Sequence, residues 1–229
     1  MNKATRPNMQ LPNAPITEKF PTIVAAIQHE RLMRYAQPAS GSMDRAFAFY
    51  TWNGTLCESF HVTLHYAEIV TRNALNRALT SRFDAEWFDN ATLHAVSEGR
   101  FAADLQEAVS KERAQHGDKM TAHHVTSALT FGFWEHLVTK RFERLLWARG
   151  VQHVLPSAPK EVSRQLVHDR IESVRRWRNR IAHHRAIFDK GPTRKHQETL
   201  ELIGWACTDT RDWVAAASRV PVAIALRPK

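Results

Sequence analysis

The sequence predicts an all-α protein, and three observations support that fold class. Only 8 of the 229 residues are glycine, so few positions favour the tight turns that join strands. No stretch alternates apolar and polar residues between turn-forming residues, as a half-buried strand would. Apolar residues recur instead at intervals of three and four along nearly the whole chain, which places them on one face of a helix.

Capping residues and apolar periodicity predict four helices in the first half of the chain. Pro21 suits a first helical turn, and Asp44 is a suitable N-cap. The pair Asn53-Gly54 is typical of a turn and is expected to end the second helix. Residues 83–95 are expected to form a turn with a short helix. The four predicted helices cover residues 22–36, 44–52, 56–82 and 98–114.

Three further helices are predicted in the second half. Thr121 can cap the first of them, and Pro156 with Pro159 marks a loop before the second. The predicted helices cover residues 121–150, 160–184 and 193–217. The segment from Pro221 is expected to be poorly ordered. The sequence thus predicts one all-helical domain over residues 16–218, a disordered lead over 1–15 and a short tail over 219–229.

Composition and cysteine usage favour a cytoplasmic protein. Hydrophobic residues make up 43% and charged residues 24% of the chain, which is ordinary for a globular domain. Cys57 and Cys207 lie far apart in no Cys-x-x-Cys pattern, so neither a disulfide framework nor a thiolate metal site is expected. The N-terminus lacks a signal-peptide core, and no run approaches the roughly 18 apolar residues of a membrane span.

Positive charge is concentrated in the segment 164–185. The net charge of +9 is carried mostly by arginine. Such a run is usually a solvated helix face, but guanidinium groups also bind phosphate through paired hydrogen bonds and stack on bases. We therefore expect a nucleic acid partner, specifically RNA. The arginines assigned to RNA binding are Arg175, Arg176, Arg180 and Arg185.

Arg178 interrupts an apolar stripe on the predicted helix 160–184. The members of this stripe, spaced four, three, four and three residues apart, are Val167, Ile171, Val174, Arg178 and Ile181. A charged group on an otherwise buried face needs a partner or a function. Arg178 is therefore a candidate functional residue.

Asn179 and His183 are four residues apart, so their side chains lie one above the other on a helix. Imidazole is the side chain that exchanges protons near neutral pH, which makes His183 a candidate for acid–base chemistry. The alternative for His183 and His184 is structural. Cationic histidines stabilise a helix C-terminus by about 0.3–1 kcal/mol and bind its last carbonyl groups.

The segment Arg178-Asn179-Arg180-Ile181-Ala182-His183 resembles the R-N-x-x-x-H signature of HEPN domains, in the form found in the Abi-like (abortive infection) proteins of bacteria. The likeness covers roughly residues 21–214. Further blocks that are similar in order and spacing are 46–53, 68–74, 131–134 and 142–147. The chain departs from the family at Arg185-Ala186-Ile187-Phe188, where family members often carry an acidic residue and a proline.

The resemblance implies an HEPN-like helical bundle with additional helices, usually a homodimer whose two motif helices face each other. It implies a metal-independent endoribonuclease without a cofactor, acting in phage defence or as a toxin. An antitoxin protein, a bound RNA or control of assembly would restrain such a toxin. The RNA 2′-OH would attack the scissile phosphate and leave a 2′,3′-cyclic phosphate. Arg178 would hold the phosphate, Asn179 would orient His183 or donate to the phosphate, and His183 would transfer protons.

Other residues are expected to have supporting roles. His184 is a neighbour of the catalytic set, and the match to a family block implies that Glu68, Arg72 and Asn73 buttress the motif helix. Trp177 is expected either in the core, with Trp134, Trp147, Trp205 and Trp213, or stacked on a base. The pairs His61/His65 and His123/His124 lack a marked third ligand, so no metal site is expected.

Three other functions remain open at this point. A non-catalytic HEPN protein would bind RNA through the same arginines without cleaving it. A helical DNA-binding regulator would bind duplexes in a salt-dependent manner. A metal-dependent hydrolase would lose activity with a chelator. Phosphate-loop, dinucleotide-binding and GxSxG patterns are absent from the sequence, which disfavours nucleotide-driven motors, dinucleotide enzymes and α/β-hydrolases.

Overall fold

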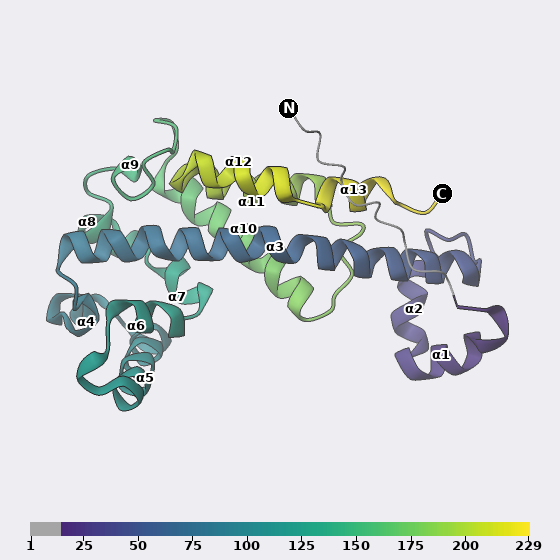
Figure 1. The fold of residues 1–229 in the computed structure, drawn as a ribbon, viewed down its shortest axis with the longest axis horizontal. Coiled ribbons are helices and arrows are strands. Elements are labelled where there is room, and N and C mark those ends of the chain that lie inside the picture. Colours follow the sequence, from purple (N-terminus) through teal and green to yellow (C-terminus); the bar gives the residue numbers. More distant parts are fainter. Residues whose placement is uncertain (1–14) are drawn as a thin grey trace. The chain divides into compact units, whose positions relative to one another are not determined.

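Helices make up the regular structure in the computed structural model of the chain, which describes residues 15–229 (Figure 1). No strand occurs among those residues, so the all-α prediction is confirmed. The predicted disordered lead, apart from Pro15, lies outside the described residues. Where the sequence predicts one domain, the described residues fall into two compact units. Unit 1 comprises residues 15–62, 180–196 and 218–229, and unit 2 comprises residues 63–179 and 197–217.

The long helix α3 runs without interruption over Met43–Arg82. The predicted break at Asn53-Gly54 is therefore wrong. Asn53 is 7% exposed, and its Oδ1 accepts hydrogen bonds from the backbone N–H groups of Ile187, at 2.8 Å, and Phe188, at 3.2 Å. These buried bonds outweigh the turn propensity of an Asn-Gly pair, because local propensity is a weak preference that tertiary contacts override.

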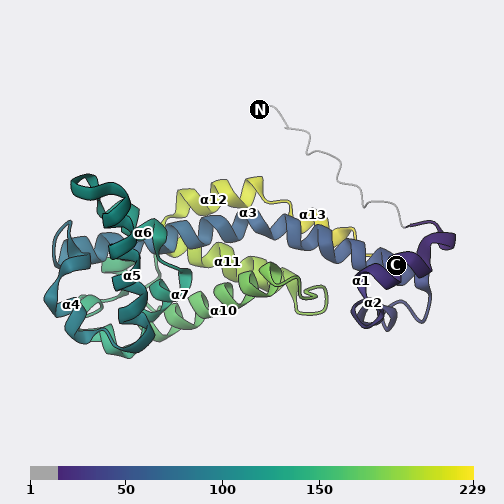
Figure 2. The same cartoon turned by 90° about the horizontal axis from the view of Figure 1, so that it is seen from below.

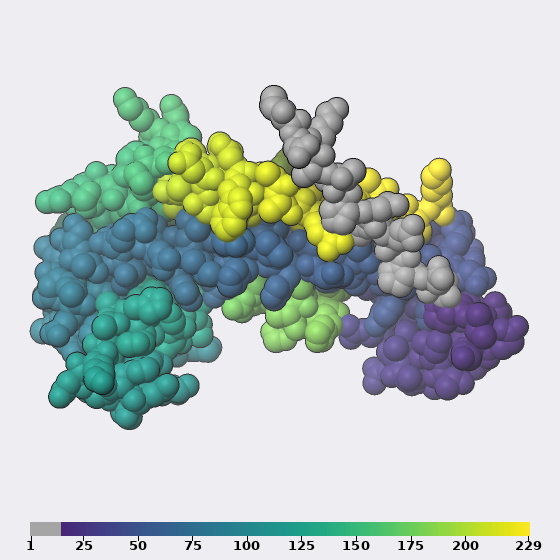
Figure 3. Space-filling view, viewed as in Figure 1, coloured from purple at the N-terminus to yellow at the C-terminus, as the bar shows by residue number. Residues whose placement is uncertain are grey.

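Two short helices begin unit 1 where one was predicted over residues 22–36. They follow the single 3-10 turn η1 (Thr17–Lys19), and they are α1 (Phe20–Ile27) and α2 (His29–Ala36). Gln28 separates them because its φ of 70° lies in the left-handed region, which a continuing helix cannot contain. Figure 3 shows α1 and α2 as one continuous mass, in purple.

An aromatic cluster forms the core of unit 1 around Phe188. The ring centroid of Phe188 lies 5.1 Å from that of Tyr35, 6.0 Å from that of Phe49 and 6.5 Å from that of Trp52. Aromatic pairs at such separations contribute beyond their buried area. Phe188 follows α10 (Arg164–Ala182), the motif helix that carries Arg178 and Asn179. The segment after this helix is thereby packed into the core of unit 1.

The C-terminal segment is ordered, which contradicts the prediction made for the residues from Pro221. Helix α13 (Val220–Ala225) buries Val220 and Ala223 completely. The indole Nε1 of Trp52 donates a hydrogen bond of 2.7 Å to the Ala223 carbonyl. The segment is held because it satisfies a buried donor and covers apolar side chains of unit 1.

Unit 2 holds most of the remaining helices, and Figure 2 shows α5 beside α6 and α7. Stacked rings of Phe101 and Phe133, with centroids 4.2 Å apart, pack α5 against α7. The elements in chain order are η2 (Trp87–Asp89), α4 (Ala91–Val96), α5 (Gly99–His116), η3 (Gly117–Lys119), α6 (Ala122–Ala128), α7 (Phe131–His136), η4 (Lys140–Phe142), α8 (Glu143–Leu146), α9 (Val151–Val154), α10 (Arg164–Ala182), α11 (Pro192–Ala206) and α12 (Thr208–Ala217).

The helix predicted over 121–150 is divided into short pieces. Thr121 forms the predicted cap, in a capping box with His124. A second cap explains the start of α7, because the Thr130 side chain accepts a hydrogen bond from the Phe133 N–H. The helix predicted over 193–217 is likewise interrupted, at Cys207.

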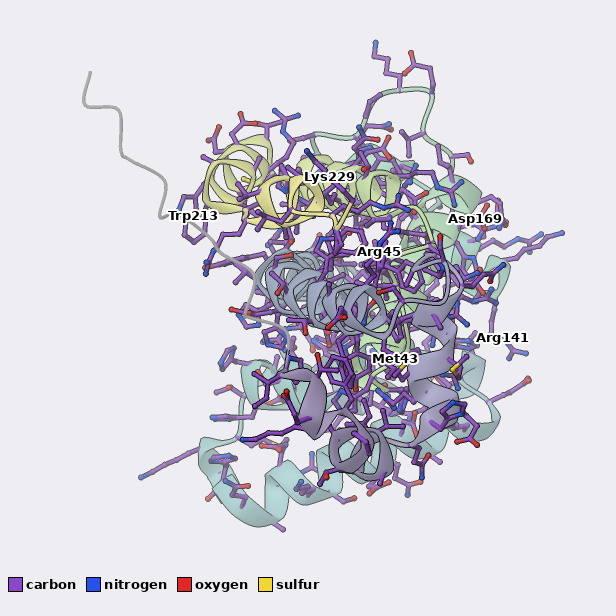
Figure 4. All side chains as sticks on the ribbon, turned by 90° about the vertical axis from the view of Figure 1, so that its right-hand side faces the viewer. Met43, Arg45, Arg141, Asp169, Trp213 and Lys229 are labelled. Carbon is purple, nitrogen blue, oxygen red and sulfur yellow. The ribbon has the colours of Figure 1, made fainter. Side chains whose placement is uncertain are left out.

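Trp213 lies on α12, after the interruption at Cys207. Trp213 is 57% exposed and projects away from α12 in Figure 4, so its predicted place in the core is wrong. Its ring contacts Tyr66, with centroids 4.8 Å apart. The other tryptophans predicted to be in the core are buried: Trp134, Trp147, Trp177 and Trp205.

None of the helices in the described part of the chain has the length and apolar composition of a membrane span.

The buried imidazole of His196 makes the stability of unit 1 sensitive to acid. Its Nε2 lies 2.8 Å from the Ser218 hydroxyl, and its ring meets the edge of Phe60. Burial lowers the pKa of His196 below its usual value, so protonation favours the unfolded chain. The stabilisation is therefore fully present above about pH 6.5, the usual value in unfolded chains, and is lost as the pH falls through the lower folded pKa.

We expect the His196→Gln variant to lose less stability than the unsubstituted protein when the pH is lowered from neutral to acidic. The free energy of unfolding would be measured by denaturant titration at several pH values. Parallel pH profiles for the two proteins would contradict this prediction.

Candidate functional site

The apolar stripe of α10 continues through Trp177 instead of Arg178. Val167, Ile171 and Val174 are buried as predicted, and Trp177 is 3% exposed. Placing Arg178 within the buried stripe was therefore wrong, since the Arg178 side chain is 43% exposed. A helix has 3.6 residues per turn, so a stripe shifts gradually across it, and at this turn Trp177 faces the core. Burial also contradicts the alternative that Trp177 stacks on a base.

Arg178 is held by two neighbouring side chains. Its Nη2 lies 3.2 Å from the nearer carboxylate oxygen of Glu68, on α3, and its Nη1 donates to Asn179 Oδ1 at 3.1 Å. A guanidinium carries five N–H donors, so these two partners leave others available to a ligand. Glu68 thus contacts the motif helix, as predicted for a buttressing residue.

Among the described residues, Arg178 forms its ion pair and side-chain hydrogen bonds with Glu68 and Asn179, and not with Arg72 or Asn73. Among the described residues Arg72 forms no ion pair with Glu68, and its Nε is buried without a hydrogen-bond partner. Asn73 is exposed on α3. Their role in supporting the motif helix therefore stays a prediction.

A cavity of about 590 Å³ lies beside Arg178 and Asn179, entirely within unit 2. Cavities of roughly 300–1,000 Å³ accommodate ligands the size of a nucleotide. The motif residues therefore face a space that can hold a ligand. Charged residues also lining the cavity are Glu98, Arg100, Asp104, Glu135 and Arg175.

His136 lines the same cavity and was not among the residues singled out from the sequence. Its ring lies against Phe101, with centroids 4.4 Å apart. Burial and then the positive charge of Arg141 lower the pKa of His136, although Glu135 opposes them. The cavity therefore holds a neutral imidazole at neutral pH. The only feature of the sequence that could have indicated His136 was its position two residues after the block 131–134.

Helix α10 ends in a backbone arrangement centred on His184. The His184 N–H bonds to the Ile181 carbonyl and the Arg185 N–H bonds to the Arg180 carbonyl, each at 2.9 Å, while His184 has a φ of 53°. This pair of bonds with a left-handed residue is the Schellman motif. His184 thus serves the helix end, whereas the exposed His183 has no recorded partner among the described residues.

Side chains of unit 1 anchor the loop of residues 184–189, which follows the motif. Arg31 donates to the His184 carbonyl, and Arg34 forms an ion pair of 3.0 Å with Asp189. Burial opposes ionisation of Asp189, but the charge and hydrogen bond of Arg34 outweigh it and lower the pKa of this carboxyl. Arg180 donates to the Ala186 carbonyl at 2.7 Å, so it secures the loop from the helix side.

Most of the arginines predicted to bind RNA already have protein partners. Arg175 pairs with Glu135, Arg176 pairs with Glu172 at 2.6 Å, and Arg180 holds the loop. An arginine in an ion pair must give up that partner before it can bind a phosphate fully. Arg185 is exposed, with no side-chain partner recorded in the described part of the chain.

Comparisons with protein-family models, curated proteins and solved structures found no match to this chain. In the part of the chain that the structure describes, no group of three or more histidine, cysteine or acidic side chains is arranged to hold a metal ion. A functional assignment therefore depends on the contacts and chemistry of the site.

Proposed function

We propose that this chain is a metal-independent HEPN-type endoribonuclease. The observation that carries the proposal is the placement of Arg178, which is held by Glu68 and Asn179 while facing a cavity that a nucleotide can enter. His183 follows on the same chain segment, one residue beyond the last helical residue of α10, with an exposed imidazole. These are a fixed cation and a proton-transfer group within six consecutive residues.

Such a set of groups suits cleavage through the RNA's own nucleophile. A histidine removes the 2′-OH proton, the 2′-oxygen bonds to phosphorus, and the bond from phosphorus to the 5′-oxygen breaks. A second histidine donates a proton to the departing 5′-oxygen, which leaves a 2′,3′-cyclic phosphate and a 5′-hydroxyl. Arg178 stabilises the charge that builds on the phosphate oxygens.

One chain supplies one His183, so the proposal includes a homodimer in which the two copies provide base and acid. The dimer would act in the cytoplasm, in phage defence or as a toxin, and an antitoxin protein or RNA would restrain it. The alternative is a non-catalytic HEPN protein that binds RNA through the same residues.

A pair of matched substitutions tests the catalytic role of His183. Asparagine tolerates the left-handed conformation of position 184, so His184→Asn removes an imidazole and preserves the helix end. We expect His183→Asn to abolish cleavage of RNA and His184→Asn to retain it, in buffer containing a chelator. Product ends would be identified by mass spectrometry. Retained cleavage by His183→Asn would overturn the assignment, and binding without cyclic-phosphate products would favour the non-catalytic alternative.

A further inference from the structure

A second cavity in unit 2 is lined by basic residues and by no acidic ones. Its volume is about 270 Å³, and it lies between the end of α3 and the segment of α8 and α9. The charged or titratable residues in its lining are Arg82, Arg144, Arg149 and His153, and the Ser81 hydroxyl is also present. It shares no lining residue with the cavity beside Arg178.

These basic side chains are available to a ligand, unlike most arginines of α10. All four are exposed, and none has an ion pair or a side-chain hydrogen bond recorded among the described residues. The guanidinium of Arg82 lies over the Phe83 ring, 5.6 Å from its centroid, which restricts its position without using its N–H donors.

Three arginines around one concave space repel one another unless a counter-ion enters. An anion in this space is stabilised by the summed electric field of the arginines, because a cleft lined by charges of one sign focuses that field. Guanidinium groups match the geometry of phosphate oxygens, and a serine hydroxyl adds a further donor. The volume lies below the roughly 300 Å³ at which cavities begin to enclose whole ligands. A phosphate group fits this space better than a complete nucleotide does.

We infer that this cavity is a phosphate-binding site, occupied either by a backbone phosphate of RNA or by the phosphate of a small phosphorylated molecule. The inference rests on charge and shape at Arg82, Arg144 and Arg149 and does not depend on cleavage at Arg178. In an RNA-cleaving enzyme the site would hold a phosphate away from the scissile one.

The test compares two triple variants that lose the same charge. The first is Arg82→Gln, Arg144→Gln, Arg149→Gln. The control is Arg45→Gln, Arg77→Gln, Arg219→Gln, which removes three exposed arginines that do not line the cavity. Binding of inorganic phosphate would be measured by calorimetry. Binding of a 2′-O-methyl RNA oligonucleotide, which lacks the 2′-OH nucleophile, would be measured by fluorescence anisotropy at several salt concentrations.

We expect the first triple variant to bind at least one of the two probes tenfold or more weakly than the control, since each charge-assisted hydrogen bond is worth about tenfold or more. Loss of RNA affinity, with a salt slope reduced by about 0.7 for one phosphate, identifies the RNA backbone as the source. Loss of phosphate binding alone identifies a small phosphorylated molecule. Equal affinities of both triple variants for both probes would overturn the site.

Two features keep this test independent of folding and of catalysis. The single variant Arg149→Gln should shift affinity in the same direction by a smaller factor if the triple variant unfolds. Because the oligonucleotide cannot be cleaved, a failed nuclease proposal leaves these binding results interpretable.

Discussion

Replacing Arg178 with alanine is expected to slow RNA cleavage by about a hundredfold to a thousandfold, the range found when a group that stabilises transition-state charge is removed. The fold should persist, because the Arg178 side chain is 43% exposed and its partner Glu68, 21% exposed, retains access to water. Arg178→Lys should recover only part of the rate, since an ammonium keeps the charge but loses the planar donor geometry.

Glu68→Gln tests whether Glu68 positions Arg178. We expect a smaller fall in the single-turnover rate than for Arg178→Ala, with binding of uncleavable RNA less affected than the rate. Arg113→Ala is a suitable control, because Arg113 forms an exposed ion pair with Asp89 and lines neither cavity. An Arg178→Ala enzyme with the full cleavage rate would remove Arg178 from the mechanism.

Asn53→Ala is expected to lower the free energy of unfolding by about 2–6 kcal/mol. The substitution leaves the N–H groups of Ile187 and Phe188 without their acceptor in a buried environment, at about 1–3 kcal/mol for each orphaned donor. The loss of stability should be larger than that caused by Asn73→Ala.

Asn73→Ala is the matched control for Asn53, because both asparagines lie in α3 and Asn73 is exposed. Its free energy of unfolding should change by no more than about 0.5 kcal/mol, as is usual for surface substitutions. Denaturant titration of both variants measures the difference. A cost below about 1 kcal/mol for Asn53→Ala would show that the two buried bonds contribute little net stability.

Much of the helical content could be predicted because its signals are local. Helix α5 (Gly99–His116) was predicted over 98–114, and α10 (Arg164–Ala182) was predicted over 160–184. The cap at Thr121 and the buried positions Val167, Ile171 and Val174 were also anticipated. Periodicity and capping act over a few residues, so they can be read without knowledge of the fold.

The candidate site could be predicted in part. Arg178 and Asn179 were singled out, and the structure adds that they face a cavity and that Glu68 reaches Arg178 from α3. His136 was missed because it comes near the motif only through packing of α7 and α10 around that cavity. No short spacing in the sequence marks this relation.

Local sequence was sufficient for the helical class of this protein, for the approximate bounds of α5 and α10 and for the order of residues in the Arg178–His183 segment. Contacts between distant segments decided the rest. They kept α3 continuous through Asn53, paired Arg175 with Glu135, and gathered Arg82 with Arg144 and Arg149. The physical reason is that charge and hydrogen bonding depend on which groups become neighbours, and residues far apart in the chain become neighbours only on folding.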